Sequence, residues 1–293
     1  MGVFAQLLVN GIIAGSIYAL VASGFSLIYS TNRFVHFAHG AVVVVAAYIM
    51  YSLFSLLNLS FFLAFLLTVI LSGVLGYIQF KFVYLPLKNK KSSATILLMA
   101  SVALMLLFEN VVLLLFGSDV KLINTFEVGK GLEFFGIIIT KIQVLIIAVT
   151  LILLVGLRLL LKKTKLGKSF RAVADNPSLA DIMGINAKKL QSLSFVIGSA
   201  IAGVASVLIA IEQNIEPFMG SRLMIKGFTA AIIGGVTSVE GAVLGSLLLG
   251  LVENFGIWFL PSGYKDAIAF AALILFLIFR PSGILGIHKG HKA

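Results

Sequence analysis

The run ATILLMASVALMLLFENVVLLLF, Ala94–Phe116, contains a single charged residue, Glu109. A helix needs about 20 consecutive, mainly apolar residues to cross the hydrocarbon core of a bilayer, which is ~30 Å thick. This run therefore predicts a membrane-spanning helix. It also argues against a transmembrane β-barrel, because barrel strands alternate apolar and polar residues over about 10 positions.

Other apolar runs recur along the chain, which has 293 residues, 60% of them hydrophobic and only 11% charged. Ordinary soluble domains are about 25% charged. Further crossings are predicted at residues 7–29, 61–80, 142–161 and 191–211, and at two shorter runs, 41–57 and 264–280. The sequence therefore predicts an all-α polytopic membrane helix bundle with seven or eight spans, forming one transmembrane domain over residues 1–293.

The net charge of +11 is unevenly distributed along the chain. Placing residues 162–190 in the cytoplasm puts most Lys and Arg side chains on that side and the N-terminus outside, in agreement with the positive-inside bias. The charge is thus explained by orientation in a lipid bilayer, and no nucleic-acid partner is predicted. The chain contains no cysteine, so neither a disulfide nor a thiolate metal site is expected.

Residues 225–256 are rich in glycine and precede the final span. Because the previous span ends outside and the basic C-terminus belongs inside, this stretch and the final helix must together cross an odd number of times. The simplest solution is a re-entrant hairpin with arms at 227–236, about 15 Å long as a helix, and 241–256. Irregular backbone at membrane depth requires surrounding protein or a water-filled cavity. A translocation path is therefore predicted beside Gly234, Gly235, Thr237, Ser238, Glu240 and Gly241, with close packing of two short helices as the equal alternative.

A second polar interruption, STNRFVHFAHG, occupies residues 30–40 between the first two spans. Its polar side chains would be costly in lipid and are expected at the cytoplasmic mouth or inside the bundle. His36 and His39 can share a helix face, and with Phe37 and Gly40 they are assigned to the translocation path. The simpler interpretation, which we favour, is a polar helix start that shapes the inner gate. Two histidines without a carboxylate or thiolate provide too few ligands for a metal site.

Several other polar features fall between or within the spans. Residues 120–128, VKLINTFEV, alternate in polarity before a glycine-containing turn and predict a short external hairpin. Glu109, Glu253 and Asn254 lie inside spans, where an ionisable residue is a functional candidate by default. We assign them to structure or path lining rather than to proton transfer, and no catalytic residue is predicted.

The segment 162–190 combines a basic face with two short predicted helices. Asn176 followed by Pro177 is typical of a helix N-cap and first residue, and Gly184 suits a left-handed stop after Met183. A preceding helix at 167–174 would complete a compact helix–turn–helix element that can transmit a push. Its basic residues are assigned to topology and lipid contacts: Lys162, Lys163, Lys165 and Lys168.

Within this segment, RAVADNPSLADIMGI, residues 171–185, resembles the ATPase-contact motif of bacterial ABC-importer permeases of the branched-chain amino-acid, LivH/LivM type. The blocks VHFAHGAVVVVAAY at 35–48 and AAIIGGVTSVEGAVLGSLLLGLVE at 230–253 are similar to further segments of that family. The resemblance assigns ATPase coupling to Arg171, Ala172, Asp175, Asn176, Pro177, Ala180, Gly184 and Ile185.

The resemblance implies a permease subunit that moves Leu, Ile and Val across the bacterial inner membrane by alternating access. It implies four kinds of partner: a second homologous permease, two cytoplasmic ATP-binding subunits, an extracytoplasmic solute-binding protein and the lipid bilayer. ATP and Mg are expected on the ATP-binding subunits. This chain is expected to bind no cofactor, since it has no GxxxxGK[ST] loop.

Two departures from the family pattern leave alternatives open. Ala41 stands where a polar or acidic residue is often found, and Thr237 stands where a further glycine is common. Urea, short amides or other amino acids are therefore alternative solutes. A secondary transporter would share the broken helices but would not need residues 171–185. A membrane enzyme is disfavoured, since the sequence has no HExxH motif and no paired intramembrane aspartates.

Overall fold

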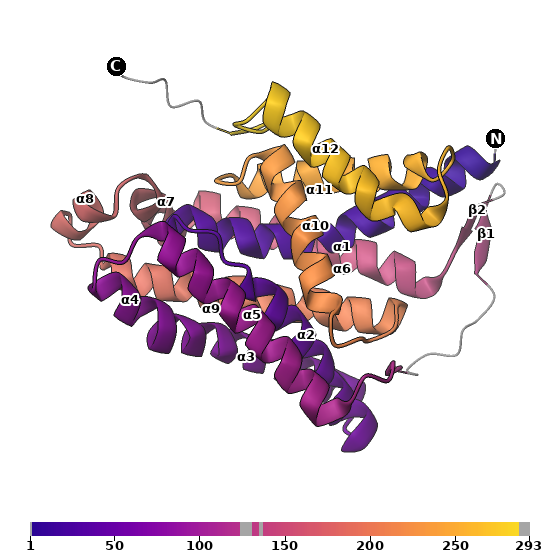
Figure 1. Ribbon diagram of the computed structural model, residues 1–293, viewed down its shortest axis with the longest axis horizontal. Helices are drawn as coiled ribbons and strands as arrows, with labels where there is room; N and C mark the ends of the chain where they lie inside the picture. The colour runs from indigo at the N-terminus through magenta and orange to yellow at the C-terminus, as the bar shows by residue number, and fades with distance from the viewer. Residues whose placement is uncertain (1, 124–130, 135–136, 287–293) are drawn as a thin grey trace.

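The computed structural model describes residues 2–123, 131–134 and 137–286. Within these ranges the chain is almost entirely helical, and most helices run along the long axis of the molecule (Figure 1). A π-helical turn, Ser52–Leu56, extends α2, another, Phe80–Tyr84, joins α3 to α4, and a 3-10 turn, Ser262–Tyr264, precedes α12. The helices are α1 (Gly2–Asn32), α2 (Ala38–Tyr51), α3 (Phe61–Gln79), α4 (Leu85–Asn89), α5 (Ala94–Phe116), α6 (Lys141–Lys163), α7 (Lys165–Asp175), α8 (Pro177–Ile182), α9 (Ala187–Glu212), α10 (Met219–Gly234), α11 (Val239–Gly256) and α12 (Lys265–Phe279).

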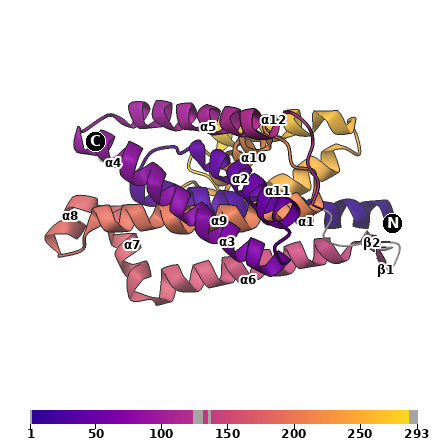
Figure 2. The same cartoon turned by 90° about the horizontal axis from the view of Figure 1, so that it is seen from below.

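Eight helical segments of the described chain are long and apolar enough to cross a membrane. The predicted all-α polytopic bundle is therefore confirmed. Helix α1 lies at its centre, with 89% of its most apolar window buried, whereas the corresponding figure for α12 is 6%. Figure 2 shows α5 and α6 on opposite sides of α1 and α9. The outer helices expose large apolar side chains such as Leu114, Ile152 and Phe279, as expected for surfaces that face lipid.

The two ends of the bundle differ in charge. Helices α7 and α8 lie at one end, and the N-terminus and the strands lie at the other (Figure 1). The lysines 162, 163, 165 and 168 are at the α7 end, so we refer to it as the cytoplasmic end and to the opposite one as the outer end. The segment after α12 is also at the cytoplasmic end, where the Ile284 N–H donates to the Ile233 carbonyl (2.9 Å).

Helix α11 packs against α1 and α10 through glycines that allow close backbone approach. A Cβ atom added at Gly250 would overlap the carbonyl oxygen of Gly11 in α1, and one added at Gly245 would overlap that of Ala230 in α10. Gly234 and Gly241 approach each other in the same way. Small residues at such crossings let membrane helices gain van der Waals contact that larger side chains would prevent.

The re-entrant geometry predicted for residues 225–256 is not confirmed. Helix α10 begins at Met219 rather than near residue 227, and its 16 residues correspond to about 24 Å. Its turn into α11 reaches the cytoplasmic end, where Glu240 pairs with Lys162 of α6 (2.8 Å). Helix α10 therefore leads into α11 through a turn at the cytoplasmic end, but its 16 residues are not among the eight segments of the described chain that are long and apolar enough to cross a membrane. Helices α11 and α12 belong to two of those eight segments, Val239–Gly256 and Ser262–Phe279.

The external hairpin lies further along the chain than expected. Strands β1 (Leu132–Phe134) and β2 (Ile137–Ile139) pair antiparallel, and the side chain of Gln6 in α1 holds them through Ile138. Within the predicted hairpin, Lys121 instead pairs with Ile215 between α9 and α10. The prediction of a hairpin at 120–128 is therefore wrong for Lys121, and residues 124–128 lie outside the described residues.

Candidate functional site

The cytoplasmic element is a pair of helices with well-defined caps. The Thr164 side chain accepts a hydrogen bond from the Gly167 N–H (3.0 Å) at the start of α7. The Asn176 side chain accepts from the N–H groups of Ser178 (3.0 Å) and Leu179 (3.1 Å), which satisfies donors that a helix start leaves unpaired. Gly184 has a φ of 81° and ends the second helix in the left-handed conformation. The residues predicted to start and stop α8 therefore do so.

A small apolar core fixes this element to the bundle. It contains the buried side chains Phe170 and Val173 of α7, Ala180 of α8, and Ala187 and Leu190 of α9. The Asp181 carboxylate accepts from the Ala187 N–H (2.8 Å). These contacts make α7 and α8 a packed unit rather than a loose loop.

The eight predicted coupling residues occupy this unit but have different environments. Arg171 donates to the Leu161 carbonyl at the end of α6, Ala180 is buried, and the Ile185 N–H donates to the Ala180 carbonyl (2.9 Å). Ala172 lies on α7, Asp175 and Asn176 at the junction, Pro177 at the start of α8, and Gly184 just beyond its end.

Three residues absent from that prediction form the exposed apolar surface of α8. Leu179, Ile182 and Met183 are 59%, 79% and 80% exposed. Their spacing of three and four residues places them on one helix face, and this spacing is visible in the sequence. They form the most exposed apolar group on the cytoplasmic element, and we call them the α8 apolar surface.

A cavity of about 800 Å³ lies between the cytoplasmic element and the bundle. It brings together Arg171 and Asp175 from the predicted coupling set and Thr237 and Ser238 from the predicted path set. The C-terminal ends of α1 and α6, helix α7, the α10–α11 turn and the segment after α12 enclose it. Its lining residues are Leu27, Ser30, Arg33, Leu161, Lys162, Phe170, Arg171, Ala174, Asp175, Thr237, Ser238, Val239, Glu240, Pro281, Ser282 and Leu285.

The predicted glycines of the turn serve close packing. Gly234 and Gly241 contact each other across the turn, and Gly235, with a φ of 111°, lies against the backbone of Gly286. None of the three lines the cavity. These glycines are therefore closely packed, whereas Thr237 and Ser238 line the cavity, and the assignment of the turn to a translocation path stays a prediction.

The four path residues predicted from the FAHG segment form a separate buried cluster. The His36 Nδ1 atom lies 2.9 Å from the Tyr84 hydroxyl, and the Phe37 N–H donates to Ser101 Oγ (3.1 Å). His39 packs against Gly24 of α1, and Gly40 packs against Gly220 at the start of α10. The structure does not bring this cluster to the cytoplasmic cavity. Among the described residues, no group of three or more potential metal ligands occurs.

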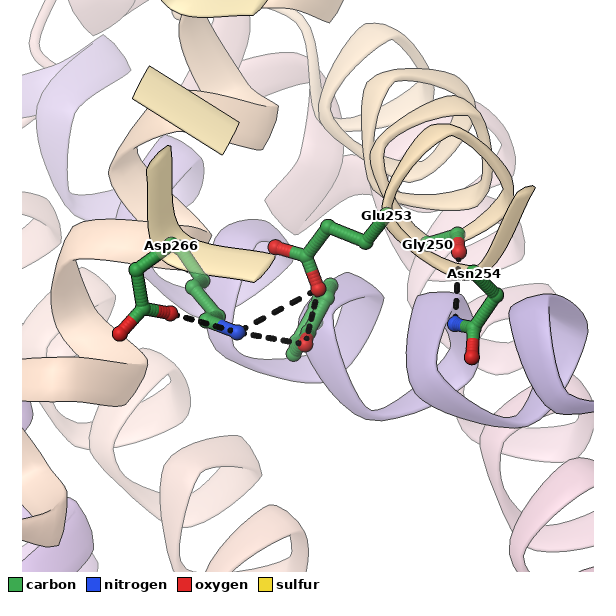
Figure 3. Close-up of polar contacts among 6 residues, drawn as sticks. Gly250, Glu253, Asn254 and Asp266 are labelled. Carbon is green, nitrogen blue, oxygen red and sulfur yellow. Dashed lines mark hydrogen bonds and ion pairs between the residues drawn. The ribbon is translucent and has the colours of Figure 1, made fainter. Parts of the chain in front are cut away.

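The charged groups inside the bundle have specific partners. The Glu253 carboxylate accepts from the Tyr18 hydroxyl (2.8 Å) and pairs with Lys226 (3.3 Å), which also pairs with Asp266 (3.1 Å). Figure 3 shows Glu253 and Asp266 on either side of this ammonium group. The network joins α1, α10, α11 and α12. Sequence reasoning assigned no role to Lys226, because its partners lie on three other helices.

The other two intramembrane polar residues bind backbone groups. Glu109 of α5 accepts from the Ser221 N–H (2.8 Å) in the first turn of α10, where unpaired N–H groups favour a carboxylate. The Asn254 side chain donates to the Gly250 carbonyl (2.8 Å) in its own helix (Figure 3). Both side chains therefore bind backbone groups of the bundle, and their assignment to structure or path lining stays a prediction.

Eight apolar spans, glycine-mediated helix contacts and a packed cytoplasmic helix pair define a multi-pass membrane protein. The model of the family described as branched-chain amino acid transport system / permease component matches residues 7–277. The chain belongs to this family, as its sequence motifs suggested, and its role is that of an ABC importer permease.

Two curated relatives cover nearly the whole chain. The high-affinity branched-chain amino acid transport system permease protein BraD of Pseudomonas aeruginosa is 37% identical over 296 residues, which are 97% of this chain and 96% of BraD. The corresponding LivH of Escherichia coli is 34% identical over 297 residues, with 97% and 96% coverage. A chain of PsaBC from Streptococcus pneumoniae, solved in complex with Fab, shares the fold at 14% identity, with a TM-score of 0.52 and 94% and 93% coverage.

Proposed function

We propose that this chain is the permease subunit of an ATP-driven importer that carries leucine, isoleucine and valine across the bacterial inner membrane. The names of BraD and LivH, both high-affinity branched-chain amino acid permeases, support these solutes. The chain works with a second homologous permease, two cytoplasmic ATP-binding subunits and an extracytoplasmic solute-binding protein. Those ATP-binding subunits use ATP and Mg, and this chain binds no cofactor of its own.

The observation that carries the proposal is the α8 apolar surface on a packed cytoplasmic helix pair. Three large apolar side chains project from this short element: Leu179 and Ile182 of the six-residue α8, and Met183 at its C-cap. Their exposure is unfavourable in water and is relieved when a partner covers them. Because this surface lies at the cytoplasmic end, an ATP-binding subunit is the partner that fits it.

Two polar contacts connect the helix pair α7–α8 to the bundle. Arg33 at the end of α1 donates to the Ala174 carbonyl of α7, and Arg171 of α7 donates to the Leu161 carbonyl of α6. From α6, the pair between Lys162 and Glu240 continues to the start of α11 (2.8 Å). A displacement of the cytoplasmic element is thereby communicated to helices α1, α6 and α11.

Alternating access requires that the ATP-binding subunits hold one permease conformation more tightly than the other. ATP-driven closure of those subunits moves α7 and α8 together, because Phe170, Val173 and Ala180 share one core. The attached helices then change the side on which the translocation path opens. The path residues assigned from the sequence, among them His36, His39, Thr237 and Ser238, are the candidates that become accessible in turn.

The substitution Gly184→Arg tests the coupling role. Gly184 has positive φ and no neighbouring atom within 4 Å of an added Cβ, and Gly117 at the outer end of α5 has the same two properties. Gly117→Arg is therefore a matched control for backbone strain and for added charge. Both variants are reconstituted with the complete complex, and ATP-driven uptake of labelled leucine and of labelled urea is measured.

We expect Gly184→Arg to abolish leucine uptake and binding of the ATP-binding subunit while membrane insertion remains normal. Gly117→Arg should retain uptake. Normal ATP-driven uptake by Gly184→Arg would contradict the coupling role. Uptake of urea in preference to leucine would replace the proposed solute but not the mechanism.

A further inference from the structure

The cavity between α7 and the α10–α11 turn has the composition of a binding site for a small zwitterion. Its volume of about 800 Å³ falls within the range of roughly 300–1,000 Å³ found for small-molecule sites. We propose that it binds a free amino acid with an apolar side chain on the cytoplasmic side, and that the bound amino acid slows the transport cycle. This inference rests on the proposed function, because it takes the imported solute as the ligand.

Two of the charges that line the cavity neutralise each other. The Lys162 ammonium lies 2.8 Å from a carboxylate oxygen of Glu240, and Arg158 adds a second, longer contact to the same oxygen (3.8 Å). The lining charges that remain are Arg33, Arg171 and Asp175. The open part of the cavity therefore offers two cations and one anion.

Both arginines are held in place while donors remain free. A guanidinium group carries five N–H donors. One nitrogen of Arg33 is bound to the Ala174 carbonyl and one of Arg171 to the Leu161 carbonyl. These bonds fix the two guanidinium groups at the cavity wall. The remaining N–H groups suit a carboxylate, which forms strong charge-assisted hydrogen bonds with arginine.

Asp175 supplies the complementary charge. It is exposed at the end of α7 and lines the same cavity. Across the ranges 2–123, 131–134 and 137–286, its carboxylate has no hydrogen bond or ion pair of its own. A ligand with both a carboxylate and an ammonium group satisfies the arginines and Asp175 together. Inorganic phosphate or a lipid phosphate would instead bring a second anion to Asp175.

The remaining wall combines apolar side chains with the hydroxyl groups of Ser30, Thr237, Ser238 and Ser282. Among the apolar side chains, Leu27 of α1 and Phe170 of α7 are almost completely buried behind it. Leu161 and Val239 are partly exposed, and Leu285 after α12 is 44% exposed. These side chains can cover a branched alkyl group and remove it from water. The combination of carboxylate, ammonium and alkyl recognition describes leucine, isoleucine or valine.

A ligand in this cavity would contact two elements whose relative position changes during the proposed transport cycle. Phe170 and Asp175 belong to the cytoplasmic element, and Thr237 and Ser238 belong to the α10–α11 turn. Binding that favours one arrangement of these elements opposes the change to the other. Accumulated amino acid in the cytoplasm would thereby reduce further import.

The first test measures binding of labelled leucine to the assembled permease–ATPase complex in nanodiscs, without the solute-binding protein. The competitors are 4-methyl-2-oxopentanoate, which lacks the ammonium group, and 3-methylbutylamine, which lacks the carboxylate. Each missing charge-assisted contact is expected to weaken binding by about tenfold or more. Absence of leucine binding, or equal binding of all three compounds, would overturn the proposal.

Two variants locate the site. Leu285→Trp fills the cavity, and its control is Leu260→Trp at the outer end, where the leucine has nearly the same exposure, 46% against 44%. Arg33→Gln removes one of the two guanidinium groups that would donate hydrogen bonds to the ligand carboxylate, and it adds no bulk. We expect leucine binding to be lost in Leu285→Trp, weakened about tenfold in Arg33→Gln and retained in Leu260→Trp. Unchanged binding in both cavity variants would place the leucine elsewhere and overturn the proposal.

The second test measures regulation in proteoliposomes that enclose ATP with or without unlabelled leucine. Enclosed leucine should lower the initial rates of uptake and of ATP hydrolysis in the wild type and leave both rates of Leu285→Trp unaffected. Equal rates with and without enclosed leucine in the wild type would overturn the regulatory role. If no branched-chain amino acid is imported, the proposed function fails. If leucine is imported normally but is not bound in the cavity, only the present inference fails.

Discussion

Lys162 at the cytoplasmic end of α6 and Glu240 in the first turn of α11 form an ion pair in which Nζ and Oε1 are 2.8 Å apart. The pair links the helix that leads into the cytoplasmic element with the helix that follows the α10–α11 turn. Both side chains are partly exposed, at 54% and 39%. Such a pair contributes little to stability, about 0–1 kcal/mol, so its importance lies in the connection that it makes.

Glu240→Gln should uncouple transport without destabilising the protein. We expect ATP-driven uptake to fall by about fivefold or more, the lower range of typical coupling between sites, while the unfolding temperature in detergent changes little. Glu133→Gln, at an exposed position of β1, is the control and should transport normally. Unaltered uptake by Glu240→Gln would show that the pair has no part in coupling.

Lys226→Met should destabilise the bundle strongly. The substitution removes the cation between Glu253, which is 1% exposed, and Asp266. Leaving one partner of a buried pair uncompensated costs about 3–5 kcal/mol. The double variant Lys226→Met, Glu253→Gln should recover part of this loss, because the buried carboxylate is also gone. Denaturant unfolding in micelles measures both. A double variant no more stable than the single one would contradict the ion-pair assignment.

Two glycine substitutions should have opposite effects on stability. A Cβ at Gly245 would overlap the Ala230 carbonyl oxygen, so Gly245→Ala must separate α10 from α11 at an expected cost of about 1–3 kcal/mol. A Cβ at Gly156 in α6 meets no atom within 4 Å. Gly156→Ala should therefore stabilise its helix by about 0.5–1 kcal/mol. The free energy of unfolding is measured for both variants. If both substitutions changed it in the same direction, the close packing of α11 would be contradicted.

Asn176→Ala should loosen α8 selectively. The substitution removes the two hydrogen bonds to Ser178 and Leu179, and loss of an N-cap costs about 0.5–2 kcal/mol. Hydrogen exchange of residues 177–185 should accelerate, and ATP-driven uptake should fall with it. Asn176→Ser, which keeps a capping oxygen, should restore both. Unchanged exchange in the alanine variant would contradict the capping role.

The spans could be predicted because a bilayer imposes length and polarity on each segment separately. The run Ala94–Phe116 begins and ends as α5 does. The predicted cap at Asn176 and stop at Gly184 are also local features, set by one side-chain oxygen and one positive φ. Each of these elements is specified by neighbouring residues in the chain.

Helix α10 could not be predicted in the same way. Its first half contains Arg222 and Lys226, whereas the predicted segment begins at residue 225 and folds back as a re-entrant hairpin to satisfy the required number of crossings. Lys226 is tolerated because Glu253 and Asp266 approach it from α11 and α12. No local pattern reveals that arrangement, since the partners are brought together only by the tertiary fold.

In the candidate site, too, the residue types could be predicted from the sequence but their tertiary arrangement could not. The coupling residues Arg171 and Asp175 and the turn residues Thr237 and Ser238 were predicted as two separate sets, yet they line one cavity. Arg33 also lines it, although it precedes these four residues by more than a hundred positions in the sequence. Conversely, the predicted histidines 36 and 39 pack in a different buried cluster. The sequence indicated these residue types, and the packing of α1, α7 and the turn decides which of them meet.

The most direct test of coupling through α8 is site-directed cross-linking, which is simple because the chain contains no cysteine. Met183→Cys places a thiol on the α8 apolar surface, and Phe259→Cys places one at the outer end with similar exposure, 86% against 80%. In the reconstituted complex, Met183→Cys should cross-link to the ATP-binding subunit with a yield that changes with bound nucleotide, and Phe259→Cys should not cross-link to it. Full ATP-driven uptake with no cross-link at Met183→Cys under any nucleotide condition would contradict the account.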